Sequence, residues 1–212
     1  MDQSRASYPA RLDIEYPEEG LNRLTTLFRI ILAIPIFVVI GLLGGGGPNT
    51  QQIGEATWIV VSTSGFLVVP TLLMLLFRRK YPRWWFDWNL ELSRFSTRVT
   101  AYFLLMRDEY PSTDEEQAVR LELDYPDAER DLNRWLPLIK WLLAVPHYIV
   151  LTILGIIAMV LLVAAWFAIL FTGRYPRGIF RYMLGVNRWA LRVAAYVWLL
   201  TTDRYPPFSF EE

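Results

Sequence analysis

The chain has 212 residues, of which 54% are hydrophobic and 20% charged, and its 21 basic side chains balance 21 acidic ones. The apolar content excludes an intrinsically disordered chain, and the zero net charge argues against nucleic-acid binding, which usually leaves a basic surface. Charged residues are absent from 56–77 and from 141–172. Because a bilayer core needs about 20 apolar residues, these two segments exclude a simple soluble domain and predict an integral membrane protein.

Each half of the chain opens with a short alternating stretch, RLDIE at 11–15 and RLELD at 120–124. Alternation with a period of two predicts a half-exposed strand, and the Tyr-Pro that follows ends it because proline cannot continue a ladder. The two strands could pair with each other into a small soluble sheet.

Apolar segments follow each strand. In the first half they predict a transmembrane hairpin around a glycine-rich loop at 44–55. The second half has only Gly155 at the corresponding place, so its apolar run is either one long tilted helix or a tight hairpin. The hairpin is favoured because it keeps every basic flank on one side of the membrane. The four predicted transmembrane helices are residues 23–43, 56–77, 134–154 and 156–172.

Prolines lie inside the first apolar helix of each half, at Pro35 and Pro146. Membrane helices tolerate proline but usually kink there. Arg29 and Lys140 lie near the ends of these helices, where long side chains can extend to the membrane surface. His147, the single histidine, follows Pro146 in an apolar segment without carboxylates, so we expect it to pack rather than bind a ligand.

After each apolar region comes an amphipathic helix, predicted at 83–106 and at 177–201. Arginines gather on one face of each helix, opposite aromatic residues. An arginine at the bilayer centre costs about 2.5–3.5 kcal/mol, so these helices are expected to lie in the membrane interface. This face is either an ordinary solvated one or a contact for lipid headgroups. The arginines concerned are Arg83, Arg94, Arg98, Arg177, Arg181, Arg188 and Arg192.

These segments recur in the same order because the sequence repeats itself. Residues 11–17 (RLDIEYP) return as 120–126 (RLELDYP), and 32–37 (LAIPIF) return as 143–148 (LAVPHY). Such self-similarity predicts an internal duplication. We therefore expect two tandem repeats, 1–112 and 113–212. Each would hold a short strand, a transmembrane hairpin with a kinked first helix, and an interfacial amphipathic helix. The whole would be an all-α integral membrane protein.

Three stretches of the second half carry a family resemblance: 133–148 (NRWLPLIKWLLAVPHY), 171–178 (FTGRYPRG) and 202–208 (TDRYPPF). With them the chain resembles the prokaryotic membrane family catalogued as domain of unknown function 4389. The resemblance implies a multi-pass membrane protein. It implies no activity, because the family has none assigned.

No segment shows a catalytic constellation. The absence of cysteine excludes disulfides, thiolate catalysis and thiolate metal sites. We therefore expect no enzyme, no cofactor and no metal. The sequence favours an accessory or scaffold subunit, or a lipid-contacting protein, in the plasma membrane with both termini cytoplasmic. Its partners would be membrane lipids, anionic headgroups among them, and an unidentified membrane protein or a second copy. The alternative is a small carrier for a lipid or hydrophobic solute, with a cavity between the repeats.

Overall fold

The computed structural model describes residues 8–36, 68–113, 115 and 117–211, and in these residues the chain is mostly helical, as predicted. An apolar helix at Val68–Arg78 ends in a π-helical turn, η1, at Met74–Arg78. The other elements, in chain order, are β1 (Ala10–Ile14), α1 (Arg23–Leu32), α4 (Arg83–Phe103), β2 (Val119–Leu123), α5 (Pro137–Leu143), α6 (Val145–Thr172) and α7 (Arg177–Val197).

The two strands form one antiparallel sheet, which confirms the predicted pairing. Leu12 faces Leu121 at the centre, and on either side a basic residue faces an acidic one: Arg11 opposes Glu122, and Arg120 opposes Asp13. Opposite charges at directly opposed positions stabilise a strand pair by about 0.2–1 kcal/mol. A one-residue slip would break both charge pairs and turn the apolar side chains outward, so the sequence specifies this register.

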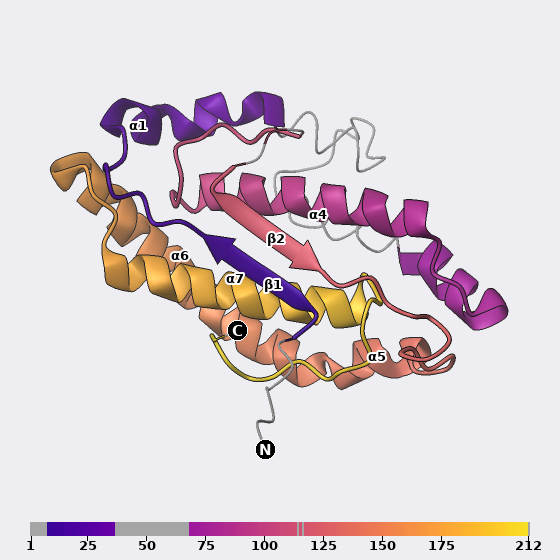
Figure 1. Cartoon of the computed structure of the whole chain (residues 1–212). Coiled ribbons are helices and arrows are strands. Elements are labelled where there is room, and N and C mark those ends of the chain that lie inside the picture. Colours follow the sequence, from indigo (N-terminus) through magenta and orange to yellow (C-terminus); the bar gives the residue numbers. More distant parts are fainter. Residues whose placement is uncertain (1–7, 37–67, 114, 116, 212) are drawn as a thin grey trace, which may run out of the picture.

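The sheet lies in front of α4 and α7, and α6 lies behind α7 (Figure 1). β1 packs on α7, β2 packs on α4, and α7 also contacts α6. One face of the sheet is therefore buried against helices, while the other carries the charged pairs. The buried face consists of Ala10, Leu12, Ile14, Val119, Leu121 and Leu123.

Tyrosine hydroxyls join the first half of the chain to the second. Tyr81 donates to the carbonyl of Leu199 at 2.8 Å, and Tyr175 donates to the carbonyl of Leu104 at 3.1 Å. Burial raises the pKa of both phenols well above the ordinary value, so they stay protonated donors at any ordinary pH. Tyr16 and Tyr125, the tyrosines that end the two strands, donate in turn to the carbonyls of Tyr175 and Tyr81.

Both proline-containing helices are interrupted two residues before the proline. Ala33 precedes Pro35 with φ −83° and ψ −11°, and Ala144 precedes Pro146 with φ −84° and ψ −5°. Proline has no N–H to donate, and its ring clashes with the carbonyl four residues earlier. The break at Ala144 separates α5 from α6, and the chain beyond Ile36 lies outside the described residues until residue 68.

The hairpin predicted for the second half, with spans 134–154 and 156–172, is wrong. α6 runs without interruption from Val145 to Thr172 and includes Gly155 in its interior. A glycine inside a helix costs only about 1 kcal/mol relative to alanine, and no polar or turn-forming residue accompanies it here. One glycine therefore does not break the run, and the alternative of a single long helix is the correct one.

The remaining predicted bounds differ from the structure in smaller ways. α4 ends at Phe103 and α7 at Val197, ahead of the predicted 106 and 201, and a residue with positive φ follows each (Leu105 at 61°, Leu200 at 55°). Residues 37–43 and 56–67 of the predicted spans 23–43 and 56–77, and the whole loop 44–55, lie outside the described residues. Among the described residues, α6 alone is long and apolar enough to cross a bilayer, so four transmembrane helices are not supported.

Because the chain lacks cysteine, a spin-label pair can test the continuity of α6. Ile149 and Val163 are both exposed and lie fourteen residues apart. With Ile149→Cys and Val163→Cys, a continuous helix places the two Cα atoms about 21 Å apart. A hairpin turning at Gly155 would bring them to about 10 Å. Pulsed electron–electron double resonance distinguishes the two distances, and each single-label variant is the control.

Candidate functional site

The seven arginines predicted to contact lipid do not form one surface in the structure. Four of them bond to backbone carbonyls of other segments, and three are exposed. The first group is Arg94, Arg98, Arg188 and Arg192, and the second is Arg83, Arg177 and Arg181. The seven arginines therefore fall into a group that holds other segments in place and a group that faces solvent.

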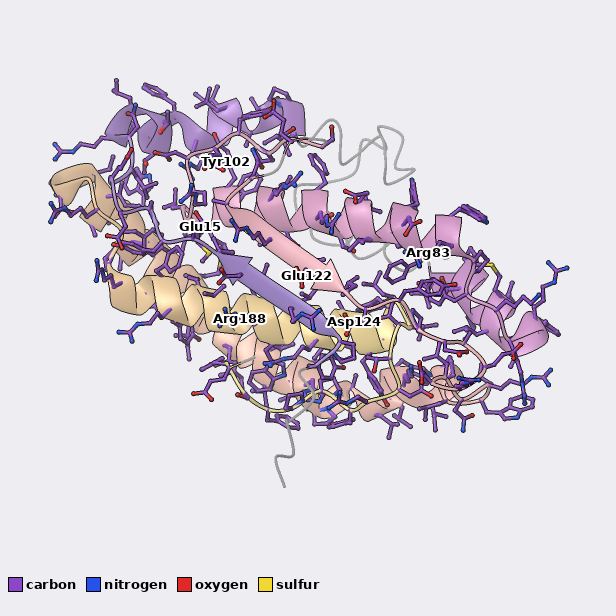
Figure 2. All side chains as sticks on the ribbon, viewed as in Figure 1. Glu15, Arg83, Tyr102, Glu122, Asp124 and Arg188 are labelled. Atoms are coloured by element: carbon purple, nitrogen blue, oxygen red, sulfur yellow. The ribbon has the colours of Figure 1, made fainter. Side chains whose placement is uncertain are left out.

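Arg94 and Arg188 fasten the sheet to the helices beneath it. Arg94 of α4 donates from Nε to the carbonyl of Leu121 in β2 at 3.1 Å. Arg188 of α7 donates from Nε to the carbonyl of Leu12 in β1 at 2.7 Å, and its Nη2 lies 3.2 Å from Asp13 (Figure 2). Each arginine thus holds the central residue of a strand from the opposite half of the chain.

Arg98 and Arg192 bond to the segments that follow their helices. Arg98 donates to the carbonyl of Ser112 at 2.8 Å. Arg192 is only 2% exposed, and its two terminal nitrogens donate to the carbonyls of Ser209 and Glu211 in the C-terminal tail. The guanidinium of Arg192 is therefore inside the protein, where it holds the tail along α7.

Arg83, Arg177 and Arg181 remain accessible. The guanidinium of Arg83 lies 4.8 Å from the ring centre of Tyr125, and that of Arg177 lies 5.2 Å from the ring centre of Tyr16. Both side chains are about 71% exposed, so water or a lipid headgroup can still reach their nitrogens. Headgroup contact is thus a prediction that geometry permits at these three residues.

Two buried ion pairs were missed by the sequence analysis. Arg29 of α1 is 3% exposed and pairs with Asp108, and Lys140 of α5 is 1% exposed with its Nζ 2.7 Å from Asp203. Each cation also lies over an aromatic ring, Tyr102 for Arg29 and Tyr196 for Lys140. The prediction that the two cations extend to the membrane surface is wrong, because each points into the protein.

A sequence signal for these pairs existed. The motif Asp-Arg/Glu-Tyr-Pro closes both halves of the chain, at 108–111 and at 203–206. Asp108 also accepts from the backbone N–H of Asn22 at 2.6 Å, and Asp203 accepts from that of Asn133. Each aspartate therefore holds both the cation of an apolar helix and the turn that leads into that helix.

His147 is fully buried in α6 and packs, as expected. Its Nδ1 accepts from the indole N–H of Trp189 at 3.1 Å, and the ring of Phe208 stacks on it with centres 4.1 Å apart. Phe210, also in the tail, packs so closely on Gly185 that a Cβ there would lie 2.7 Å from the Cβ of Phe210. The tail thus covers the junction of α6 and α7. In the described part of the chain, no three His, Asp or Glu side chains group as metal ligands would.

The outward face of α6 is an extended apolar surface. It exposes ten large hydrophobic side chains, one to four residues apart along the whole helix, and buries only four residues. The exposed ones are Val145, Ile149, Ile153, Ile156, Ile157, Met159, Val160, Val163, Phe167 and Phe171. An exposed apolar surface of this extent marks a membrane or protein contact.

A cavity of about 430 Å³ lies between α4 and α7. Leu12 of β1 forms its wall on the side of the sheet, and no charged side chain lines it. Its polar groups are the hydroxyls and amides of α4 and α7, and its apolar wall includes Leu92, Leu191 and Trp198. The volume lies within the range of small-molecule sites, about 300–1,000 Å³.

These features define a mostly helical protein, and the length and apolar surface of α6 support association with a membrane. Residues 135–209, which hold α5, α6 and α7, match the family model described as Domain of unknown function (DUF4389). This match confirms the resemblance seen in the sequence for residues 135–209. No curated protein and no solved structure matches the chain.

The Lys140–Asp203 pair makes a stability prediction. Asp203→Asn leaves a buried ammonium without its counter-charge, which costs about 3–5 kcal/mol of unfolding free energy. The exposed pair Arg83–Asp87, at 3.6 Å, is the matched control, and Asp87→Asn should cost under about 1 kcal/mol. Thermal unfolding in detergent measures both. Adding Lys140→Met to Asp203→Asn should recover part of the loss, and equal effects of the two Asp→Asn changes would contradict a buried pair.

Proposed function

We propose that the protein is a non-enzymatic membrane protein that acts as an accessory or scaffold subunit, or as a lipid-contacting element. The observation that carries this proposal is the exposed apolar face of α6 on a body whose opposite layer is a charged sheet. Such a body has a lipid side and a water side. Its buried ionisable groups are engaged in holding segments together, as Arg29 and Lys140 are.

The packing of α6 favours a helix lying along the membrane rather than across it. Tyr182 of α7 donates to the carbonyl of Leu154 at 2.9 Å, and Trp189 donates to His147, seven residues earlier on α6. α7 therefore runs antiparallel beside α6, and the sheet lies on the other side of α7. If α6 stood across the bilayer, the sheet with its charges and open edges would lie at hydrocarbon depth, where each charge costs about 2.5–3.5 kcal/mol.

In the in-plane arrangement the outward faces of α6 and of its neighbours enter one leaflet. α1 and α5 also expose apolar side chains, among them Phe28, Ile31 and Trp141, and Trp135 is exposed just before α5. Tryptophan prefers the headgroup level, and Arg177 and Arg181 near the end of α6 can meet lipid phosphates. The cytoplasmic leaflet of the plasma membrane, with both termini cytoplasmic, remains our proposal for the location. The predicted spans 23–43 and 56–77 remain a prediction, since residues 37–67 lie outside the described structure.

The proposal includes the two tandem repeats. Support comes from contacts that recur with the halves exchanged. Arg94 bonds to Leu121 while Arg188 bonds to Leu12, and all four residues occupy matching positions in the sequence repeat. The pairs Arg29–Asp108 and Lys140–Asp203 recur in the same way. A duplicated chain whose halves pack against each other presents a wide surface, which suits a scaffold for a membrane-protein partner or a second copy.

One observation favours the alternative, a small carrier for a lipid or hydrophobic solute. The cavity between α4 and α7 lies between the two halves of the chain, where such a carrier would hold its cargo.

Flotation with phosphatidylcholine liposomes tests the lipid side. Ile153→Asp with Val160→Asp places two charges on the exposed face of α6, and we expect at least a ten-fold loss of liposome binding, since each charge costs more than 1.4 kcal/mol in an apolar phase. Arg120→Ala with Arg130→Ala is the control, because it changes net charge equally on exposed side chains away from α6. Unchanged flotation of the α6 variant would contradict the proposal.

Native mass spectrometry of the protein extracted in a mild detergent tests the scaffold role. A partner protein should co-purify at fixed stoichiometry.

A further inference from the structure

The cavity between α4 and α7 has a chemical character beyond its size. Three of its four hydroxyl side chains donate to their own helix: Ser93 to the carbonyl of Asn89 at 2.7 Å, Thr97 to that of Ser93 at 2.8 Å, and Thr100 to that of Ser96 at 2.8 Å. A hydroxyl has a single proton, so these three oxygens have only lone pairs left for a ligand. The cavity is therefore rich in hydrogen-bond acceptors.

The two asparagines add to this character. Asn89 and Asn187 donate from their amide nitrogens to the carbonyls of Trp85 and Met183 at 2.7 and 2.8 Å. Their amide oxygens, which can only accept, add to the acceptor set, and each amide nitrogen keeps one further N–H. With no charged side chain in the lining, nothing there compensates an ionised head group.

The rest of the lining is apolar and calls for an apolar part in the ligand. Leu92, Leu191 and Trp198 line the same space as the acceptors. Facing positions on the two helices carry small side chains, such as Ser93, Ala190 and Ala194, yet the helices leave about 430 Å³ between them. The sheet closes this space on the side of Leu12, so a ligand enters from another side.

We propose that the cavity between α4 and α7 binds a neutral amphiphile, with a hydroxyl or amide head that donates to the acceptors of α4 and an alkyl chain against the leucines and Trp198. A long-chain alcohol or a monoacylglycerol has this chemistry. Entry from the lipid side rests on the membrane placement proposed above, whereas the binding chemistry does not.

Photolabelling in detergent tests the site without depending on membrane placement. The probe is a long-chain alcohol with a diazirine in its chain, and peptide mass spectrometry locates the label. We expect labelling of α4 and α7 around Trp198. 1-Dodecanol should compete with the label, and dodecanoate and dodecane should each need at least a ten-fold higher concentration for the same displacement. If dodecane displaced the label as effectively as dodecanol, the proposal would be overturned, because the acceptors would then contribute nothing to binding.

Two variants make the test specific. Ala194→Leu fills the cavity and should lower labelling at least ten-fold, while Ser93→Ala with Thr97→Val keeps the volume and should weaken dodecanol binding about three- to ten-fold. Thr152→Val is the control, since this threonine donates to the carbonyl of Tyr148 in the same way but lies on α6, outside the cavity. Undiminished labelling in Ala194→Leu, with unfolding temperature retained, would overturn the proposal. If Ala194→Leu does not fold, the Ser93/Thr97 variant decides alone, and unchanged dodecanol binding there would overturn it. Liposome flotation of the same preparations reports the membrane proposal separately.

Discussion

The pairing of β1 with β2 is the constraint on which the rest of the structure depends. A two-stranded sheet is marginal in water by itself, so these strands need the helices beneath them. Each strand is held by an arginine from the other half of the chain, Arg94 for β2 and Arg188 for β1. The tyrosines that end the strands reach across in the same sense. Neither half can therefore complete its own packing, and the sheet joins both halves into one body.

This interlock explains why the protein has two chemically different sides. The sheet places its charged pairs in front, and α4 and α7 form a middle layer (Figure 2). Four arginines of this layer, Arg94, Arg98, Arg188 and Arg192, donate to backbone carbonyls. α6 packs behind α7 and turns its apolar face outward. The buried pairs of Arg29 and Lys140 attach α1 and α5 to this middle layer. An apolar side and a charged side follow from the order of the layers.

The sequence specified local elements well because their signals are local. Alternation gave both strands, proline gave the breaks near Ala33 and Ala144, and arginine spacing gave α4 and α7. The prediction was wrong at Gly155, where a turn and a straight helix differ little in local energy. The helix is continuous there and packs against α7. The roles of Arg188 and Arg192 could not be predicted, because each bonds to a separate segment of the chain. The repeated Asp-Arg/Glu-Tyr-Pro motif, in contrast, could have indicated Asp203 as the partner of Lys140. The α4–α7 cavity likewise exists only through the spacing of two helices.

Hydrogen exchange of the intact chain in lipid nanodiscs tests the interlock most directly. The amides of Ala10–Ile14 and Val119–Leu123 should exchange slowly and together. Arg188→Met should speed exchange in both strands although the arginine contacts only β1, because neither strand is protected without the other. Arg181→Met, an exposed position on the same helix, should change neither. Fast exchange in the unmodified strands, or an effect of Arg188→Met confined to β1, would contradict the account.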